Sequence, residues 1–155
     1  MSQEADRADI AFLPPLIPAA AILLGLGLHF FWPIEFLPGD GARGFGWLLF
    51  ATALAIAGAA AFEMKRAHTH VDARKAATRL VTGGVFEHSR NPIYLSMTLA
   101  VVAVAGVFNS FWVLLLAAPT ARALQKLAIE PEERYLERKF GRDYLDYKAR
   151  VGRWI

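Results

Sequence analysis

The chain has 155 residues, of which 55% are hydrophobic, and its mean hydropathy is +0.33. This apolar share exceeds that of most soluble domains, so the composition predicts an integral membrane protein with an all-α fold. The absence of cysteine excludes disulfides, thiolate metal sites and a cysteine nucleophile, and the formal net charge of +3 requires no nucleic-acid partner.

Four apolar segments predict four membrane-spanning helices. The first two are residues 10–32 and 45–62, neither of which contains Asp, Glu, Lys or Arg. The third and fourth are residues 92–108 and 110–127, which are so close in sequence that they predict a tight helical hairpin. A helix needs about 20 apolar residues to cross roughly 30 Å of hydrocarbon, so we expect all four segments to span.

The connection between the first two segments contains a misleading motif. Residues 39–44, GDGARG, match the dinucleotide-binding pattern G-x-G-x-x-G. That pattern has its meaning only between a strand and a helix, and here an apolar span follows with no strand signal before it. We therefore interpret this segment as a loop.

Basic residues predict the orientation of the spans. Lys and Arg concentrate in residues 63–91 and in the chain after Ala121, whereas Arg43 is the only one between the first two spans. Basic connections remain on the cytoplasmic side of a membrane. With four spans, both basic segments and both termini are predicted to be cytoplasmic.

The cytoplasmic segment 63–91 has two groups of polar residues. His68 and His70 form a His-x-His pair that has only Asp72 as a nearby acidic residue, so a solvated loop is favoured over a metal site. The second group is a polar run that ends at Asn91, where the third helix is expected to begin. There, Asn91 is the predicted N-cap, and the free amides of the first turn are suited to an anion such as a ligand carboxylate.

The same stretch, TRLVTGGVFEHSRNPIYLS, offers further binding groups. It begins with an apolar pair and a glycine turn, and Phe86 supplies an aromatic wall. Arg90 adds a cation and Tyr94 a stacking face. The alternative interpretation is a basic juxtamembrane loop that only caps a span.

The segment 128–155 predicts a C-terminal amphipathic helix that starts near Pro131. Glu132 shares a face with its apolar residues and is a candidate site residue, whereas Glu133 is predicted to face water, as are Glu137 and Arg138. The apolar residues that recur at helical spacing are Leu136, Phe140, Tyr144, Tyr147 and Val151. This stripe is expected to lie on the membrane or on the spans.

Two stretches in this order, LVTGGVFEHSRNPIY and EPEERYLERKFGRDYLDYKARVGRW, resemble the isoprenylcysteine carboxyl methyltransferase family and its relatives, the phospholipid N-methyltransferases. The resemblance covers roughly residues 64–155. It implies a single integral membrane methyltransferase domain that binds S-adenosylmethionine at the cytoplasmic face. The residues that it assigns to the cofactor are Arg79, Leu80, Val81, Phe86, Asn91, Pro92, Ile93, Tyr94 and Glu132.

The resemblance also implies a lipophilic acceptor that enters between the spans. Its carboxyl methyltransferases bind their substrate with an arginine four positions before the tail glutamate, where this chain has Ala128. Arg122, earlier in the chain, is the candidate replacement for substrate binding. Methyl transfer to a carboxylate or thiolate needs no general base, whereas an amine must be deprotonated. The sequence assigns no catalytic residue.

Two other classes of protein are consistent with parts of the pattern. Sterol-reductase-like membrane enzymes share a similar carboxy-terminal region and use a nicotinamide cofactor, but they are much longer and have more spans. A non-enzymatic four-helix membrane protein would bind no cofactor. Binding of S-adenosylmethionine distinguishes the three.

Overall fold

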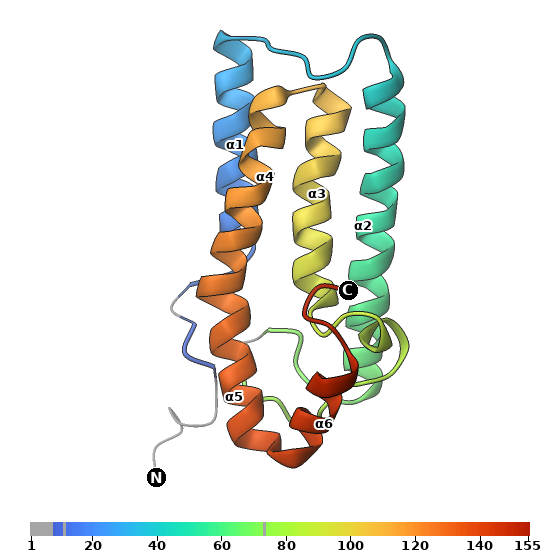
Figure 1. Ribbon diagram of the computed structural model, residues 1–155, viewed down its shortest axis with the longest axis vertical. Helices are drawn as coiled ribbons and strands as arrows, with labels where there is room; N and C mark the ends of the chain where they lie inside the picture. The colour runs from blue at the N-terminus through green and yellow to red at the C-terminus, as the bar shows by residue number, and fades with distance from the viewer. Residues whose placement is uncertain (1–7, 11, 73) are drawn as a thin grey trace. The chain divides into compact units, whose positions relative to one another are not determined.

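A computed structural model describes residues 8–10, 12–72 and 74–155, and Figure 1 shows that helices dominate it. No strand occurs in these described ranges, which agrees with the predicted all-α fold. The elements in chain order are α1 (Leu16–Phe31), α2 (Gly41–Arg66), the 3₁₀ helix η2 (Gly84–Glu87), α3 (Pro92–Phe108), α4 (Phe111–Leu124), the π-helical turn η3 (Gln125–Ile129), α5 (Glu130–Phe140) and α6 (Arg142–Arg150).

The first two predicted spans form helices whose ends differ from the prediction. Helix α1 begins at Leu16 and not at residue 10, because Pro15 follows Pro14 and a residue before proline is disfavoured in the helical conformation. Helix α2 begins at Gly41, so the segment 39–44 is only partly a loop. The Asp40 carbonyl already accepts hydrogen bonds from the amides of Arg43 and Gly44.

The predicted break before the tail is absent. Helix α5 begins at Glu130 with Pro131 and acidic residues in its first turn, as predicted, but α4, the π-helical turn η3 and α5 follow one another without interruption. Pro131 has no amide proton for the regular i→i−4 bond. The π-helical turn lies directly before it, and such turns insert into helices where the regular bonding pattern is interrupted.

The tail itself is divided at Gly141. Its φ of 53° lies in the left-handed region, which glycine adopts without steric cost. The predicted single amphipathic helix is therefore two helices, α5 and α6, that meet at this residue.

Two helical runs are long and apolar enough to cross a membrane, judged by length and composition: Gly41–Arg66 and Phe111–Phe140. Helices α1 and α3 are apolar but shorter. Large apolar side chains are exposed along α1, α2 and α4, among them Leu23, Phe30, Leu48, Leu54 and Leu115. Water-soluble surfaces rarely expose so many neighbouring apolar groups, whereas lipid accepts them.

The described chain divides into two compact units. One contains the described residues of 56–93 and 125–155 together with residues 8–10 and 12, and it holds the polar segments singled out above. The other contains residues 13–55 and 94–124. Helices α1 and α4 pack along each other in this second unit, and Val101, Ala105, Val113 and Ala117 form the centre of its core (Figure 1).

Glycines allow the helices of the second unit to approach closely. A Cβ on Gly46 of α2 would lie 2.3 Å from the amide nitrogen of Val107, and one on Gly106 of α3 would lie 2.7 Å from the Gly46 Cα. Small residues at such contacts are typical of helices that pack in lipid, where close van der Waals contact replaces the hydrophobic effect.

The α3–α4 hairpin forms as predicted, with only Asn109 and Ser110 between the helices. Asn109 adopts a φ of 46°. Its Oδ1 accepts hydrogen bonds from the amides of Phe36 and Leu37, and its Nδ2 donates to the Leu37 carbonyl at 2.7 Å. The hairpin turn therefore also fastens the α1–α2 connection.

The glycine contact predicts a position-specific response to substitution. Gly46→Ala should destabilise the protein by about 1–3 kcal/mol, because its methyl group meets backbone atoms that have no room to move. Gly44→Ala, on the same helix with no heavy atom within 4 Å of its Cβ, should be neutral or stabilising by up to about 1 kcal/mol. Thermal unfolding in detergent, followed by circular dichroism, checks this pair, and similar losses in both variants would contradict the packing described.

Candidate functional site

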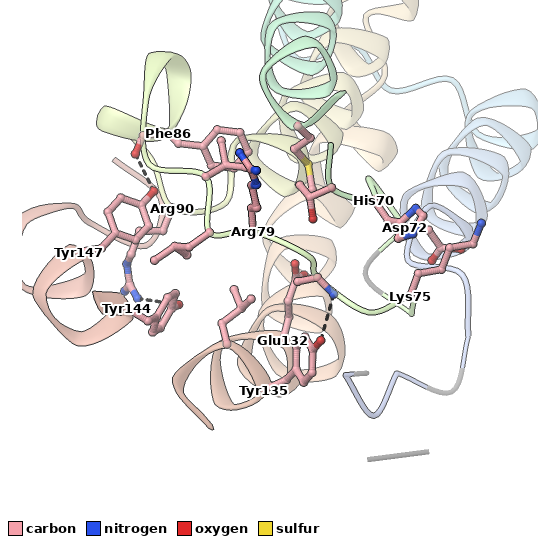
Figure 2. Close-up of a pocket in the computed structure, with 16 residues that line it drawn as sticks. His70, Asp72, Lys75, Arg79, Phe86, Arg90, Glu132, Tyr135, Tyr144 and Tyr147 are labelled. Atoms are coloured by element: carbon pink, nitrogen blue, oxygen red, sulfur yellow. Dashed lines mark hydrogen bonds between the residues drawn. The ribbon is translucent and has the colours of Figure 1, made fainter. Parts of the chain in front are cut away.

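A pocket lies within the unit of residues 56–93 and 125–155 (Figure 2). The space within it, open solvent included, amounts to about 580 Å³. Its walls come from the end of α2, the connection between α2 and η2, η2 itself, and helices α5 and α6.

One wall of the pocket is apolar and aromatic. Phe86, Tyr144 and Tyr147 are buried in one cluster with Ala60. The partly buried side chains around them include Leu80, Val81, Leu136, Phe140 and Val151. The predicted stripe of α5 and α6 does pack on a single apolar surface, although a bend at Gly141 divides it.

Hydrogen bonds hold this aromatic wall in place. The Tyr147 hydroxyl donates to the Phe86 carbonyl at 2.6 Å, which fastens α6 to η2 (Figure 2). Helix η2 begins at Gly84, whose φ of 62° lies in the left-handed region that favours glycine. A Cβ at that residue would also approach the Glu63 side chain to 3.0 Å.

A further part of the pocket lining is residues 69–79 of the connection between α2 and η2, which is folded onto itself. The Thr78 hydroxyl donates to the His68 carbonyl at 2.6 Å, and the Thr78 amide donates to the Thr69 hydroxyl at 3.1 Å. The Ala77 amide donates to the Tyr135 hydroxyl of α5 at 3.0 Å (Figure 2). Hydrogen bonds therefore hold this part of the wall, although the described residues of the connection form no regular helix.

Charged side chains of both signs line the pocket. Lys75, Arg79 and Arg90 are basic, whereas Asp72 and Glu132 are acidic. Arg74 binds Asp72 at 2.9 Å, and this hydrogen-bonded contact lowers the pKa of the Asp72 carboxyl. The arrangement can therefore receive a ligand that carries both an anionic and a cationic group next to an apolar body.

Glu133 is buried and not solvated, so the prediction that it faces water was wrong. Its side chain is only 6% exposed. Arg90 Nη1 lies 3.2 Å from its Oε1, and Arg153 makes two contacts, at 3.1 Å from Nε to Oε1 and at 2.7 Å from Nη2 to Oε2. The two arginines lie far from Glu133 in the sequence, so the pattern of α5 contained no sign of them.

The two tyrosines of α6 stay neutral in this environment. Burial raises the pKa of Tyr144 to about 12, and burial also raises the pKa of Tyr147. The Tyr144 hydroxyl accepts a hydrogen bond from Arg90 Nη1 at 3.3 Å (Figure 2). Both groups therefore act as hydrogen-bonding hydroxyls and not as bases.

The structure brings together five of the nine residues that the sequence assigned to the cofactor. The residues that line the pocket are Arg79, Leu80, Val81, Phe86 and Glu132. The remaining four, at the start of α3, do not line it: Asn91, Pro92, Ile93 and Tyr94. Arg122, the candidate for the substrate, is exposed on α4 and does not line it either.

The residues at the start of α3 have other contacts. The Asn91 Nδ2 donates to the Arg153 carbonyl at 3.1 Å and contacts Glu133 Oε1 at 3.5 Å. Ile93 packs against the aromatic cluster, and Tyr94 is buried. Asn91 therefore adjoins the ion pairs behind the pocket wall.

Sequence reasoning missed several lining residues. Tyr144 and Tyr147 had been interpreted only as part of an apolar stripe, and Tyr135 had not been singled out at all. Tyrosine in an amphipathic stripe was the available signal, since a buried hydroxyl has to find a hydrogen-bond partner.

Comparison with known proteins identifies the family. The profile of the phospholipid methyltransferase family matches residues 42–143. This stretch contains all the lining residues except Tyr144 and Tyr147. No curated protein and no solved structure matches the chain. Because the family profile covers most of its length, the chain belongs to the phospholipid methyltransferase family.

Proposed function

We propose that this protein is an S-adenosylmethionine-dependent methyltransferase that acts on a lipophilic or membrane-embedded acceptor at the cytoplasmic face of a membrane. The observation that carries the proposal is the pocket, where Arg79, Leu80, Val81, Phe86 and Glu132 converge from distant parts of the chain. The family to which the chain belongs supports methyl transfer over a nicotinamide-dependent reduction or a purely structural role.

The chemistry of the lining residues fits this cofactor. Phe86, Leu80 and Val81 provide an aromatic and apolar wall for an adenine ring. The Glu132 carboxylate suits an amine or ribose hydroxyls, to which charged acceptors form strong hydrogen bonds. The basic residues of the pocket suit a carboxylate. A binding site for S-adenosylmethionine needs each of these three kinds of group.

S-adenosylmethionine supplies an activated methyl group on a sulfonium, and the residues of the protein supply position. Displacement at the methyl group requires the acceptor in line with the breaking bond, and correct placement provides much of the acceleration. The hydrogen-bonded connection between α2 and η2 and the aromatic wall of Phe86, Tyr144 and Tyr147 serve that purpose. Acceptors that are already anionic require no base among the lining residues.

We further propose that α1, α2, α3 and α4 each span the membrane, with both termini in the cytoplasm. Helix α1 has 16 residues, which corresponds to about 24 Å at 1.5 Å per residue. A bilayer adapts to helices a few ångströms shorter than its core by local thinning. The exposed aromatic residues Phe30, Phe31 and Trp32 at the end of α1 suit a membrane interface.

In this proposal, residues 1–155 act as one methyltransferase domain. The cytoplasmic segment 63–91 and the tail 128–155 form the cofactor site, and the apolar helices admit the acceptor from the membrane. The location of the pocket supports this division, because all its lining residues lie within these two segments.

The cofactor assignment predicts direct binding. Isothermal titration calorimetry of the detergent-solubilised protein should detect S-adenosylmethionine and its demethylated product with dissociation constants of about 1 μM to 1 mM, the range in which enzyme substrates usually fall. NADPH should give no heat of binding. Binding of NADPH in place of S-adenosylmethionine would contradict the assignment.

Glu132 provides a residue-specific test. Glu132→Gln should weaken S-adenosylmethionine binding about tenfold or more, because a charge-assisted hydrogen bond is worth about 1.5–3 kcal/mol. Glu137→Gln is the matched control, since Glu137 is on the same helix, pairs with Lys148 and does not line the pocket. Glu133 is unsuitable as a control because it is buried in an ion-pair cluster. Equal losses at Glu132 and Glu137 would exclude the proposed contact.

The four-span topology predicts opposite accessibility for two residues of similar exposure. Leu37 is 46% exposed and Val71 is 47% exposed. Cysteine introduced at Val71 should react only with a membrane-permeant maleimide in intact cells, and cysteine at Leu37 should also react with an impermeant one. Because the chain has no other cysteine, labelling reports one position at a time. Impermeant labelling at residue 71 would refute this orientation.

A further inference from the structure

The segment that follows α6, residues 151–155, lies against the residues directly before α3. The Arg90 amide donates to the Gly152 carbonyl at 3.0 Å. The Asn91 Nδ2 donates to the Arg153 carbonyl at 3.1 Å, and the Ser89 hydroxyl donates to the same carbonyl at 3.5 Å. Three consecutive residues are therefore held by a segment that contributes no residue to the pocket lining.

The side chain of Arg153 reaches α5. It forms a two-pronged contact with Glu133, with Nε on one carboxylate oxygen and Nη2 on the other. This planar fork suits a carboxylate better than any lysine does. The contact with Glu133 raises the pKa of Arg153, so the guanidinium stays charged at all physiological pH values.

Glu133 connects Arg153 with the pocket, because it contacts Arg90 as well. Its Oε1 also receives Arg90 Nη1, and the Arg90 side chain is only 7% exposed. Arg90 Nε is buried and has no hydrogen-bond partner among the described residues, so Nη1, which contacts both Glu133 and Tyr144, holds the guanidinium. Arg90 lines the pocket, whereas Glu133 and Arg153 do not.

Glu133 also sets the rotation of α5. Consecutive residues of a helix point about 100° apart, so the direction of Glu133 towards the two arginines determines the direction of Glu132. Glu132 lines the pocket. One buried carboxylate therefore controls the placement of a basic and an acidic group of the site.

From these contacts we infer that Arg153 is a positioning residue of the pocket. It does not line the pocket, and it acts by holding Glu133, which in turn fixes Arg90 and Glu132. This inference rests on the proposed binding of S-adenosylmethionine. Groups that hold ligand-contacting residues commonly change affinity by tenfold or more when they are removed.

The test measures S-adenosylmethionine binding by calorimetry for the wild-type protein and a set of variants. Arg153→Gln should raise the dissociation constant about tenfold or more. Arg153→Lys keeps the charge but loses the fork, so its loss should be smaller. Arg150→Gln should have no effect, because Arg150 is exposed and contacts only the Asp146 carbonyl of its own helix.

Two further variants separate positioning from general stability. Val113→Ala, in the core of the other unit, should lower the unfolding temperature without changing the dissociation constant. In a Glu133→Gln background, Arg153→Gln should add little further loss, because both variants break the same chain of contacts.

The outcomes are distinct. Two results would show that Arg153 has no positioning role and that the inference is wrong. In the first, the wild-type protein binds S-adenosylmethionine and Arg153→Gln binds it equally well. In the second, the losses of affinity in Arg153→Gln and Glu133→Gln add in full in the double variant. An equal loss of affinity in Val113→Ala would attribute the effect to stability and would also overturn it. If the wild-type protein binds no S-adenosylmethionine, the proposed function fails and this inference fails with it.

Discussion

The Glu133 carboxylate, with almost no contact with solvent, is the constraint on which the candidate site depends. Burying an ionised carboxylate costs several kcal/mol unless cations and hydrogen-bond donors replace its water. Here Arg90 and Arg153 supply both, and Asn91 adds a further donor. These partners come from the residues before α3 and after α6, so a single side chain joins three separate stretches of the chain. Loss of either arginine would leave a buried negative charge with too few partners.

Tyrosine hydroxyls around the pocket also join separate stretches of the chain by hydrogen bonds. Tyr147 fastens η2, Tyr135 fastens the connection between α2 and η2, and Tyr144 completes the contacts of Arg90. Each hydroxyl joins elements that are distant in sequence. These hydrogen bonds join the walls of the pocket to one another, which suits a reaction whose rate depends on alignment more than on acid–base chemistry.

The two compact units have different compositions and different roles. The unit of residues 13–55 and 94–124 consists of apolar helices that meet at Gly25, Gly46 and Gly106, and it contributes no residue to the pocket lining. The other unit carries the charged cluster and the pocket. This separation is consistent with a membrane protein, because close van der Waals packing serves in lipid and ion pairs need an environment with some polarity.

The sequence by itself determined the helical class, the start of α3 at Pro92, the hairpin at Asn109 and the apolar stripe of the tail, because start signals and periodicity act within a few residues. It also identified five residues of the pocket. Only the tertiary structure decided that α4 continues into α5, that Gly141 divides the tail, and that Glu133 is buried. The periodicity of α5 placed Glu133 away from the apolar stripe, and that was correct. The periodicity could not predict that Arg90 and Arg153, which are distant in sequence, contact that side of the helix. The partners of a buried charge are chosen by the fold as a whole, so no local pattern specifies them.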